Sequence, residues 1–111
     1  MATLVEMQDI TRLYDRSRGR KRYHSETVTD ATSSPVLIPV GVEEAGVAVS
    51  PGTDALVEFT LSSYDAIKAD TATWYAWPAG AATADTADTI TGAATAIRMT
   101  SMGASSWEVT A

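Results

Sequence analysis

The stretch DALVEFTLS, residues 54–62, decides the fold class of this chain. Apolar side chains stand at every odd position from Ala55 to Leu61, and polar residues such as Glu58 and Thr60 lie between them. Because successive side chains of a β-strand point to opposite faces, an alternation of period two places the apolar set on one face. This stretch is therefore predicted to form a strand with one buried face.

Seven further segments after Tyr23 share this strand-like composition, and turn residues such as Pro51 and Gly92 separate them. Seven or eight short strands with regular turn signals are typical of an antiparallel β-sandwich or a jelly-roll-like barrel, so the chain is predicted to be mostly β. Residues 62–70 are expected to form a loop or a single helical turn, and residues 81–88 a loop. The seven segments are HSETVTD (24–30), SPVLIPV (34–40), GVAVS (46–50), TATWYAW (71–77), DTITG (88–92), TAIRMTS (95–101) and SSWEVTA (105–111).

Length and composition fit one domain, because a chain of 111 residues can bury enough surface to fold without covalent staples. The chain has no cysteine, which excludes disulfides and thiolate metal sites. Its apolar stretches are far shorter than the roughly 18 to 20 residues that a membrane span needs. Residues 1–10 carry Glu6 and Asp9 where a signal peptide would be apolar. We expect a soluble protein with no membrane contact and no export signal.

The charges divide the chain into two parts of opposite sign. Residues 1–22 contain six basic and three acidic residues, a balance of 6 − 3 = +3. From Tyr23 onward two basic residues oppose eleven acidic ones, a balance of 2 − 11 = −9. Such asymmetry suggests two parts with different partners, so we predict an N-terminal arm over 1–22 and a β-sandwich domain over 23–111.

The arm is predicted to begin with a helix over residues 4–16. Apolar residues recur there at spacings of three and four, and Thr3 and Glu6 fit a capping box. The helix is too short to be stable alone in water, so we expect its apolar stripe to order on a partner. The alternative is a solvated tail, and deletion of residues 1–22 is expected to leave a soluble β-rich domain. The stripe contains Leu4, Met7, Ile10, Leu13 and Tyr14, of which Leu4, Ile10 and Leu13 are the predicted contacts.

A basic run, RSRGRKR at residues 16–22, follows the predicted helix. Its like charges repel one another and resist burial, which favours an extended segment that a partner orders. Beside an acidic body, these charges would make only a local, salt-dependent nucleic-acid site, so nucleic acid is not the expected partner. The predicted electrostatic contacts are Arg16, Arg18, Arg20, Lys21 and Arg22.

The last two strand segments are predicted to form a hairpin. Four apolar residues of these segments stand at odd positions and should share the inner face. Directly paired residues share a face, so odd-numbered residues must pair with one another. The loop between the strands must then hold an odd number of residues. A three-residue loop over 102–104 satisfies this condition, with Gly103 available for a positive φ. The resulting register pairs Ile97 with Val109, Met99 with Trp107, and Arg98 with Glu108.

Three aromatic rings crowd the stretch TWYAWPAG, residues 73–80. Alternation puts Trp74 on one face of a strand and both Tyr75 and Trp77 on the other, so at least one ring must face outward. One interpretation has Trp74 in the core and Tyr75 flat over neighbouring Thr side chains. A second is a platform for sugar rings, and a third is an interface between protein subunits, where Trp and Tyr are enriched. We predict Tyr75 and Trp77 as interface residues.

No residue pattern predicts catalysis or a metal site. The only histidine, His24, ends the basic run, where a solvated or backbone-bonded ring is expected. Glu43 and Glu44 are adjacent and cannot form a facing carboxylate pair. Asp85 and Asp88 fall short of the ligand number of a calcium loop. We expect neither an enzyme nor a bound cofactor.

Three stretches together resemble small β-rich structural proteins of tailed bacteriophages, in particular head decoration or cement proteins. They are VSPGTDALVEFTLSS (49–63), TATWYAWPAG (71–80) and TAIRMTSMGASSWEVTA (95–111), within a resemblance that covers residues 47–111. The resemblance implies a sandwich that assembles, commonly as a trimer, on the outside of an icosahedral capsid and reinforces it. It implies the major capsid protein as partner and the virion surface as location, after synthesis in the host cytoplasm. The arm would then reach across capsid subunits.

Two other functions remain open from the sequence. A carbohydrate-binding or host-adhesion module would stack Tyr75 and Trp77 on sugar rings. A head-to-tail or tail structural protein would use the same kind of sandwich elsewhere in the particle.

Overall fold

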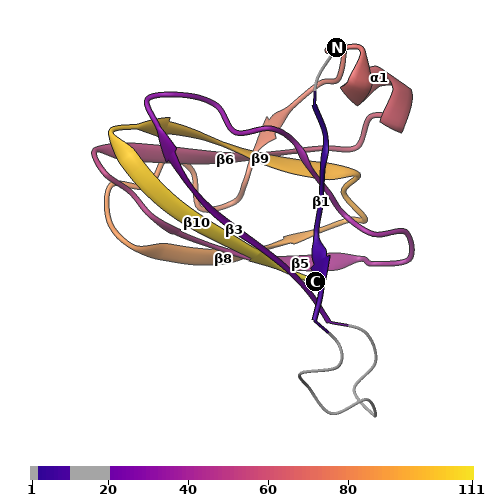
Figure 1. The fold of residues 1–111 in the computed structure, drawn as a ribbon, viewed down its shortest axis with the longest axis horizontal. Coiled ribbons are helices and arrows are strands. Elements are labelled where there is room, and N and C mark those ends of the chain that lie inside the picture. The colour runs from indigo at the N-terminus through magenta and orange to yellow at the C-terminus, as the bar shows by residue number, and fades with distance from the viewer. Residues whose placement is uncertain (1–2, 11–20) are drawn as a thin grey trace.

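The computed structural model describes residues 3–10 and 21–111, and its strands form a β-sandwich of two five-stranded sheets. Sheet A has the order β1-β4-β9-β6-β7, and sheet B has the order β2-β3-β10-β5-β8. Figure 1 shows the two layers, with β6 and β9 in one and β3, β5, β8 and β10 in the other. The elements are β1 (Val5–Glu6), β2 (Gln8–Asp9), β3 (Arg22–Thr29), β4 (Val36–Leu37), β5 (Glu44–Ser50), β6 (Asp54–Thr60), α1 (Tyr64–Lys68), β7 (Tyr75–Ala76), β8 (Thr86–Thr91), β9 (Ala96–Met102) and β10 (Ala104–Thr110).

The prediction of a mostly β chain with a sandwich architecture is confirmed, because every one of the eight predicted segments contains a strand. Two of these strands are only two residues long, β4 and β7. Prolines at 35 and 39 flank β4, and proline has no N–H to donate to a ladder. The expected helical turn is α1, which Ser63 caps by accepting a hydrogen bond from the Ala66 N–H at 3.2 Å. Ile67 anchors this helix, since its side chain is buried.

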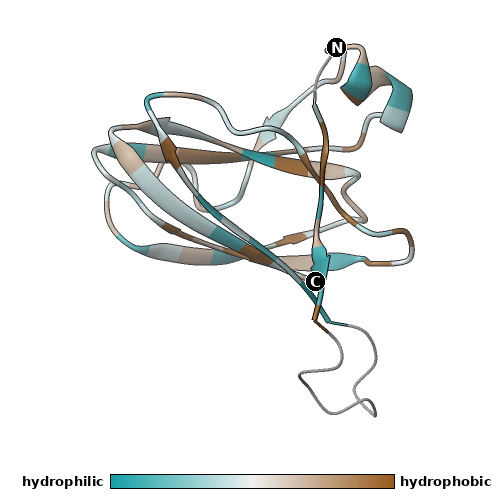
Figure 2. Cartoon of the chain, in the orientation of Figure 1, coloured by the Kyte–Doolittle hydropathy of each residue, from teal (hydrophilic) through white to brown (hydrophobic). Residues whose placement is uncertain are grey.

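The core lies between the two sheets and follows from the alternation in their strands. Ala55 and Val57 of β6 are buried, as predicted, whereas Leu61, beyond the end of the strand, is 58% exposed and Thr60 is buried. Figure 2 shows apolar and polar residues alternating along the strands. The core joins side chains from both sheets in one cluster. Its largest members are Trp77, Trp107, Met99, Ile97 and Ile90.

The predicted helix is wrong over residues 4–10, where the structure has two short strands. β1 pairs in parallel with β4, and β2 pairs antiparallel with β3. Met7, between them, is buried at 9% exposure. Val5 N–H donates to the Pro35 carbonyl at 2.9 Å, and Ile10 N–H donates to the Lys21 carbonyl at 2.9 Å. The open edges of both sheets offer backbone partners, and this pairing outweighs the helical periodicity.

The described part of the predicted arm therefore belongs to the edges of both sheets. β3 begins at Arg22, so one strand runs across the expected boundary between residues 22 and 23. The remainder of the predicted helix, residues 11–16, lies outside the described residues.

The predicted C-terminal hairpin is also wrong, because β9 and β10 belong to different sheets. β9 pairs with β6, which places Met99 opposite Val57. β10 pairs with β3 and β5, which places Trp107 between Glu26 and Val49. The inner faces were predicted correctly, since the four apolar residues of these two strands are buried. Residues at odd positions share a face when two strands pair in one sheet, and they also point toward one another when the strands lie in opposite sheets of a sandwich. The odd numbering therefore could not distinguish a hairpin from two strands in different sheets.

The corner between β9 and β10 is held by buried hydroxyl groups. Gly103 has φ +77°, the left-handed conformation expected for it. Ser101 Oγ donates to the Gly103 carbonyl at 2.7 Å and lies 2.7 Å from Ser105 Oγ. Gly52 N–H donates to Ser105 Oγ at 3.0 Å, which ties the β5–β6 turn to the same corner. The chain therefore changes sheets at a point where the polar groups are paired.

Candidate interaction site

Trp77 lies in the core, where it cannot serve as the predicted interface residue. The backbone N–H of Trp77 donates to the Val57 carbonyl at 2.9 Å, so Trp77 lies beside a residue of β6 whose side chain points inward. The indole is 2% exposed, and its Nε1–H donates to the Gly80 carbonyl at 2.5 Å. The turn after Trp77 thus supplies the acceptor that a buried indole needs.

Tyr75 remains at the surface, with 54% of its area exposed. It pairs with Phe59 across β6 and β7, and the two ring centroids are 6.0 Å apart at an interplanar angle of 36°. β7 is an edge strand of sheet A, so this ring pair lies at the margin of the sandwich. A partner can therefore reach Tyr75 without any change in the core.

Trp74, on the opposite side of this stretch, forms a cluster on the outer face of sheet A. The Cζ atom of Arg98 lies 4.2 Å from the centre of its ring. Arg98 Nε donates to Glu58 Oε1 at 3.1 Å. The pairing of β6 with β9 creates this contact, because it places Glu58 directly opposite Arg98. We call Trp74, Arg98 and Glu58 the arginine–tryptophan cluster.

The contacts within the arginine–tryptophan cluster hold the long side chain of Arg98 in one place. A partly exposed cation–π contact contributes about 0.5 to 1 kcal/mol, and a surface ion pair about 0.2 to 1 kcal/mol. Arg98 and Glu58 keep 29% and 19% of their side-chain area exposed, so the cluster is reachable from solvent. A side chain that is already held loses less conformational entropy when a partner binds. Trp, Tyr and Arg are also the residue types that dominate binding energy at protein interfaces.

The remaining predicted contacts do not gather with Tyr75. Leu4 precedes β1, and β1 and β7 form opposite edges of sheet A. Leu4, Ile10, Lys21 and Arg22 are half-buried, and the Arg22 N–H donates to the Ala111 carbonyl at 2.9 Å. The other predicted contacts lie outside the described residues, and they are Leu13, Arg16, Arg18 and Arg20.

The outer face of sheet B has a different chemistry. A hollow of about 630 Å³ lies over it, lined mainly by Ser, Thr and Ala side chains. Glu108 faces this hollow and accepts a hydrogen bond from the Tyr23 hydroxyl at 2.8 Å. Asp85 also lines it, and among the described residues that line it none is Lys or Arg. This face is mainly polar, and the hydroxyl of Tyr23 is hydrogen-bonded to its Glu108.

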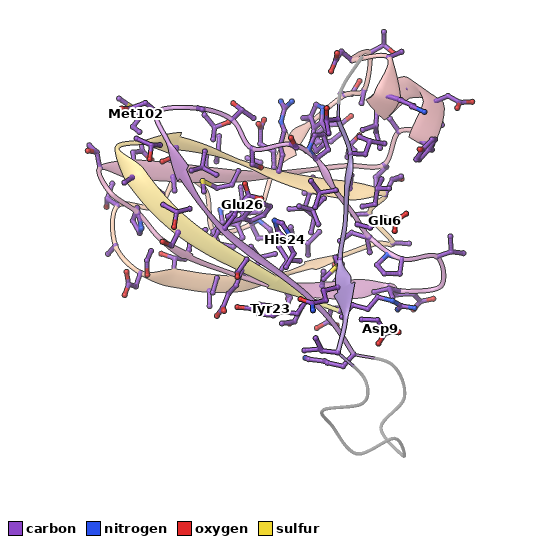
Figure 3. All side chains as sticks on the ribbon, viewed as in Figure 1. Glu6, Asp9, Tyr23, His24, Glu26 and Met102 are labelled. Carbon is purple, nitrogen blue, oxygen red and sulfur yellow. The ribbon has the colours of Figure 1, made fainter. Side chains whose placement is uncertain are left out.

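His24 lies between the sheets, where Figure 3 labels it beside Glu26. Its Nε2 contacts Glu26 Oε2, and its ring meets Trp107 edge-on at 6.0 Å and 74°. The histidine is therefore a packed side chain with one carboxylate partner. Within residues 3–10 and 21–111, no group of three or more His, Asp or Glu side chains is placed to hold a metal ion.

No protein-family model matches this chain, and no curated protein matches it. No helix in the described ranges is both long enough and apolar enough to cross a membrane.

Sequence reasoning missed the arginine–tryptophan cluster because it assigned Arg98 to the wrong carboxylate. Glu58 and Glu108 both occupy outward positions of strands, and either one matches the charge of Arg98. The hairpin prediction favoured Glu108, which is nearer in sequence. Only the strand order of the sheets decides for Glu58.

Proposed function

We propose that this chain is a virion structural protein that decorates the outer surface of a phage head and stabilises it. Its partner is the major capsid protein, and the contact surface is the outer face of sheet A around the arginine–tryptophan cluster, next to the edge strand β7 that carries Tyr75. The observation that carries the proposal is the contact of Arg98 with the Trp74 ring on the outer face of sheet A, beside the edge strand that carries the exposed Tyr75. The resemblance of residues 47–111 to cement proteins supplies the identity of the partner.

Two further observations support an assembly role. The cluster is built on β6 and β9, the central strands of sheet A, so the scaffold beneath it is hydrogen-bonded on both sides. The hollow over sheet B is lined mainly by small side chains, which contribute little binding energy at interfaces, and the Tyr23 hydroxyl near it is already hydrogen-bonded to Glu108. The outer face of sheet A is thus better suited to a protein partner than the outer face of sheet B.

The test is a rebinding experiment with phage heads that lack this protein. Purified wild-type chain is added, unbound protein is removed, and the occupancy is measured by cryo-electron microscopy. We expect Trp74→Ala and Arg98→Gln each to reduce occupancy at least tenfold, whereas Thr89→Ala on sheet B leaves it unchanged. Undiminished binding by both sheet A variants would contradict the proposed surface. Absence of wild-type density from the head, or density at the tail, would contradict the proposed function.

A carbohydrate-binding module is the second candidate, and the exposure of Tyr75 favours it. Arg98 already covers one face of the Trp74 ring, so Tyr75 would have to provide the stacking surface. A glycan array probed with wild-type protein and with Tyr75→Ala tests this function. Binding that disappears with Tyr75 would support it.

A further inference from the structure

A fully exposed valine stands beside an apolar hollow at one end of the sandwich. Val40 has a relative exposure of 104%. It occupies a tight turn that the Val42 N–H closes by donating to the Pro39 carbonyl at 3.2 Å, and Gly41 supplies φ +88°. Such a turn needs glycine at its third position but accepts polar residues at the second. The fold itself therefore does not require an apolar side chain at position 40.

The hollow next to this turn is about 380 Å³ in volume, and apolar side chains line most of it. Tyr64 of α1 closes one side and is itself 48% exposed. We call the exposed surface formed by Leu37, Ile38, Pro39, Val40 and Tyr64 the Val40 patch. Exposed apolar groups that adjoin one another in this way mark interaction sites more often than isolated ones do.

The Val40 patch carries features that complement each other. Val40 projects from the surface, and the hollow beside it is recessed. Glu6 and Arg22 line the same hollow and have opposite charges. In a two-fold contact each copy uses the same surface, so a projection next to a recess, and an acid next to a base, can satisfy their equivalents in the other copy.

We propose that a second copy of this chain packs on the Val40 patch, with Val40 of each copy entering the hollow of the other. Glu6 of one copy would face Arg22 of the other. This contact does not depend on the proposed attachment to a capsid, because purified protein alone should form it. Burial of a valine and its surroundings provides the driving force.

The dependence of association on salt concentration distinguishes this apolar contact from one driven by charge. Each chain has a net charge of −6, so two copies repel one another at long range. Raising the salt concentration from about 50 mM to about 500 mM shortens the screening length several-fold and weakens that repulsion. An apolar contact between two such copies should therefore tighten as salt rises, whereas a contact between basic and acidic segments should loosen.

The test is analytical ultracentrifugation of the full chain at increasing concentrations up to roughly 500 μM, well within the range where weak dimers form. We expect wild-type protein to reach twice the 11.7 kDa mass of one chain, and to do so at lower concentration in high salt. Val40→Asp should weaken association at least tenfold. Its fold should persist, because residue 40 is fully exposed, and circular dichroism checks this.

Met102→Asp is the matched control, since Met102 is also exposed, at 59%. Figure 3 shows it at the far end of the sandwich from Glu6. This variant should associate like wild type. A charge exchange refines the test: Glu6→Arg should weaken association, and adding Arg22→Glu to the same chain should restore it.

Three results would overturn the proposal. The first is a wild-type chain that stays monomeric at the highest concentration. The second is an oligomer that Val40→Asp leaves intact. The third is an oligomer that dissociates as salt rises, which would indicate that charge rather than burial of Val40 drives the contact.

Discussion

The two outer faces of this sandwich differ more than their sequences suggest. Both sheets alternate apolar and polar residues, and both bury one face in the same core. Sheet A directs Trp74 and Arg98 outward, whereas the corresponding positions of sheet B carry mainly Ser, Thr and Ala. The alternation establishes that a face is outward, and the size and charge of its side chains then determine what that face can bind.

The largest expected effect is the difference in stability cost between removing the inward ring of Trp77 and removing the outward ring of Trp74. Trp77→Ala removes a buried indole and should reduce the free energy of unfolding by about 3 to 5 kcal/mol. Trp74→Ala loses a partly exposed cation–π contact and should cost about 1 kcal/mol. Urea denaturation monitored by circular dichroism measures both values. Equal costs would mean that the two rings are not on opposite faces.

The next effect concerns the corner at which the chain passes from sheet A to sheet B. A Cβ added at Gly52 would lie 2.6 Å from the backbone N and O atoms of Ala104, so Gly52→Ala should destabilise the fold by about 1 to 3 kcal/mol. Gly46→Ala is the control, because its Cβ would meet only the Thr110 hydroxyl, at 3.2 Å. We expect the control to cost less than half as much in thermal unfolding. A neutral Gly52→Ala would argue against this close approach.

A smaller effect tests the strand order within sheet A. A double-mutant cycle on Arg98 and Glu58, with each residue changed to Gln, should give a coupling energy of about 0.2 to 1 kcal/mol. The same cycle on Arg98 and Glu108 should give none, because those residues lie in different sheets. Coupling between Arg98 and Glu108 instead would support the predicted hairpin, in which these two residues are paired.

The smallest effect belongs to the outer face of sheet B. Glu108→Gln weakens one exposed hydrogen bond from Tyr23, so stability should change by less than about 0.5 kcal/mol. Binding to phage heads should also stay at the wild-type level in the rebinding experiment. A large loss of binding would indicate that the contact surface lies on sheet B and not on sheet A.

The sequence allowed the inner faces to be predicted but not the pairing of strands. Alternation alone identified Met99 and Trp107 as core residues. Their neighbours depend on which strands share a sheet, and that order follows from contacts distant in sequence. For the same reason Arg98 was assigned to Glu108, although Glu58 lies opposite it.

The aromatic stretch and the N-terminus show two further limits. Alternation correctly separated Trp74 from Tyr75 and Trp77, yet it could not decide which set faced the core. The indole of Trp77 is buried where a turn carbonyl accepts its N–H, a partner that the strand pattern does not reveal. Near the N-terminus, Leu4, Met7 and Ile10 fit a helical spacing, but the unpaired edges of both sheets favour strands there.

Strands β1 and β2 are joined through Met7, so one short segment covers an edge of each sheet. Residues 3–10 therefore protect both sheets from pairing with the strands of other chains. A protease that removed them would uncover backbone donors and acceptors of β3 and β4 together, and exposed strand edges are templates for pairing with other chains. The sequence suggested that a chain without residues 1–22 would stay soluble. The structure leads to the opposite expectation: the shortened chain should retain most of its core but form β-rich aggregates during storage.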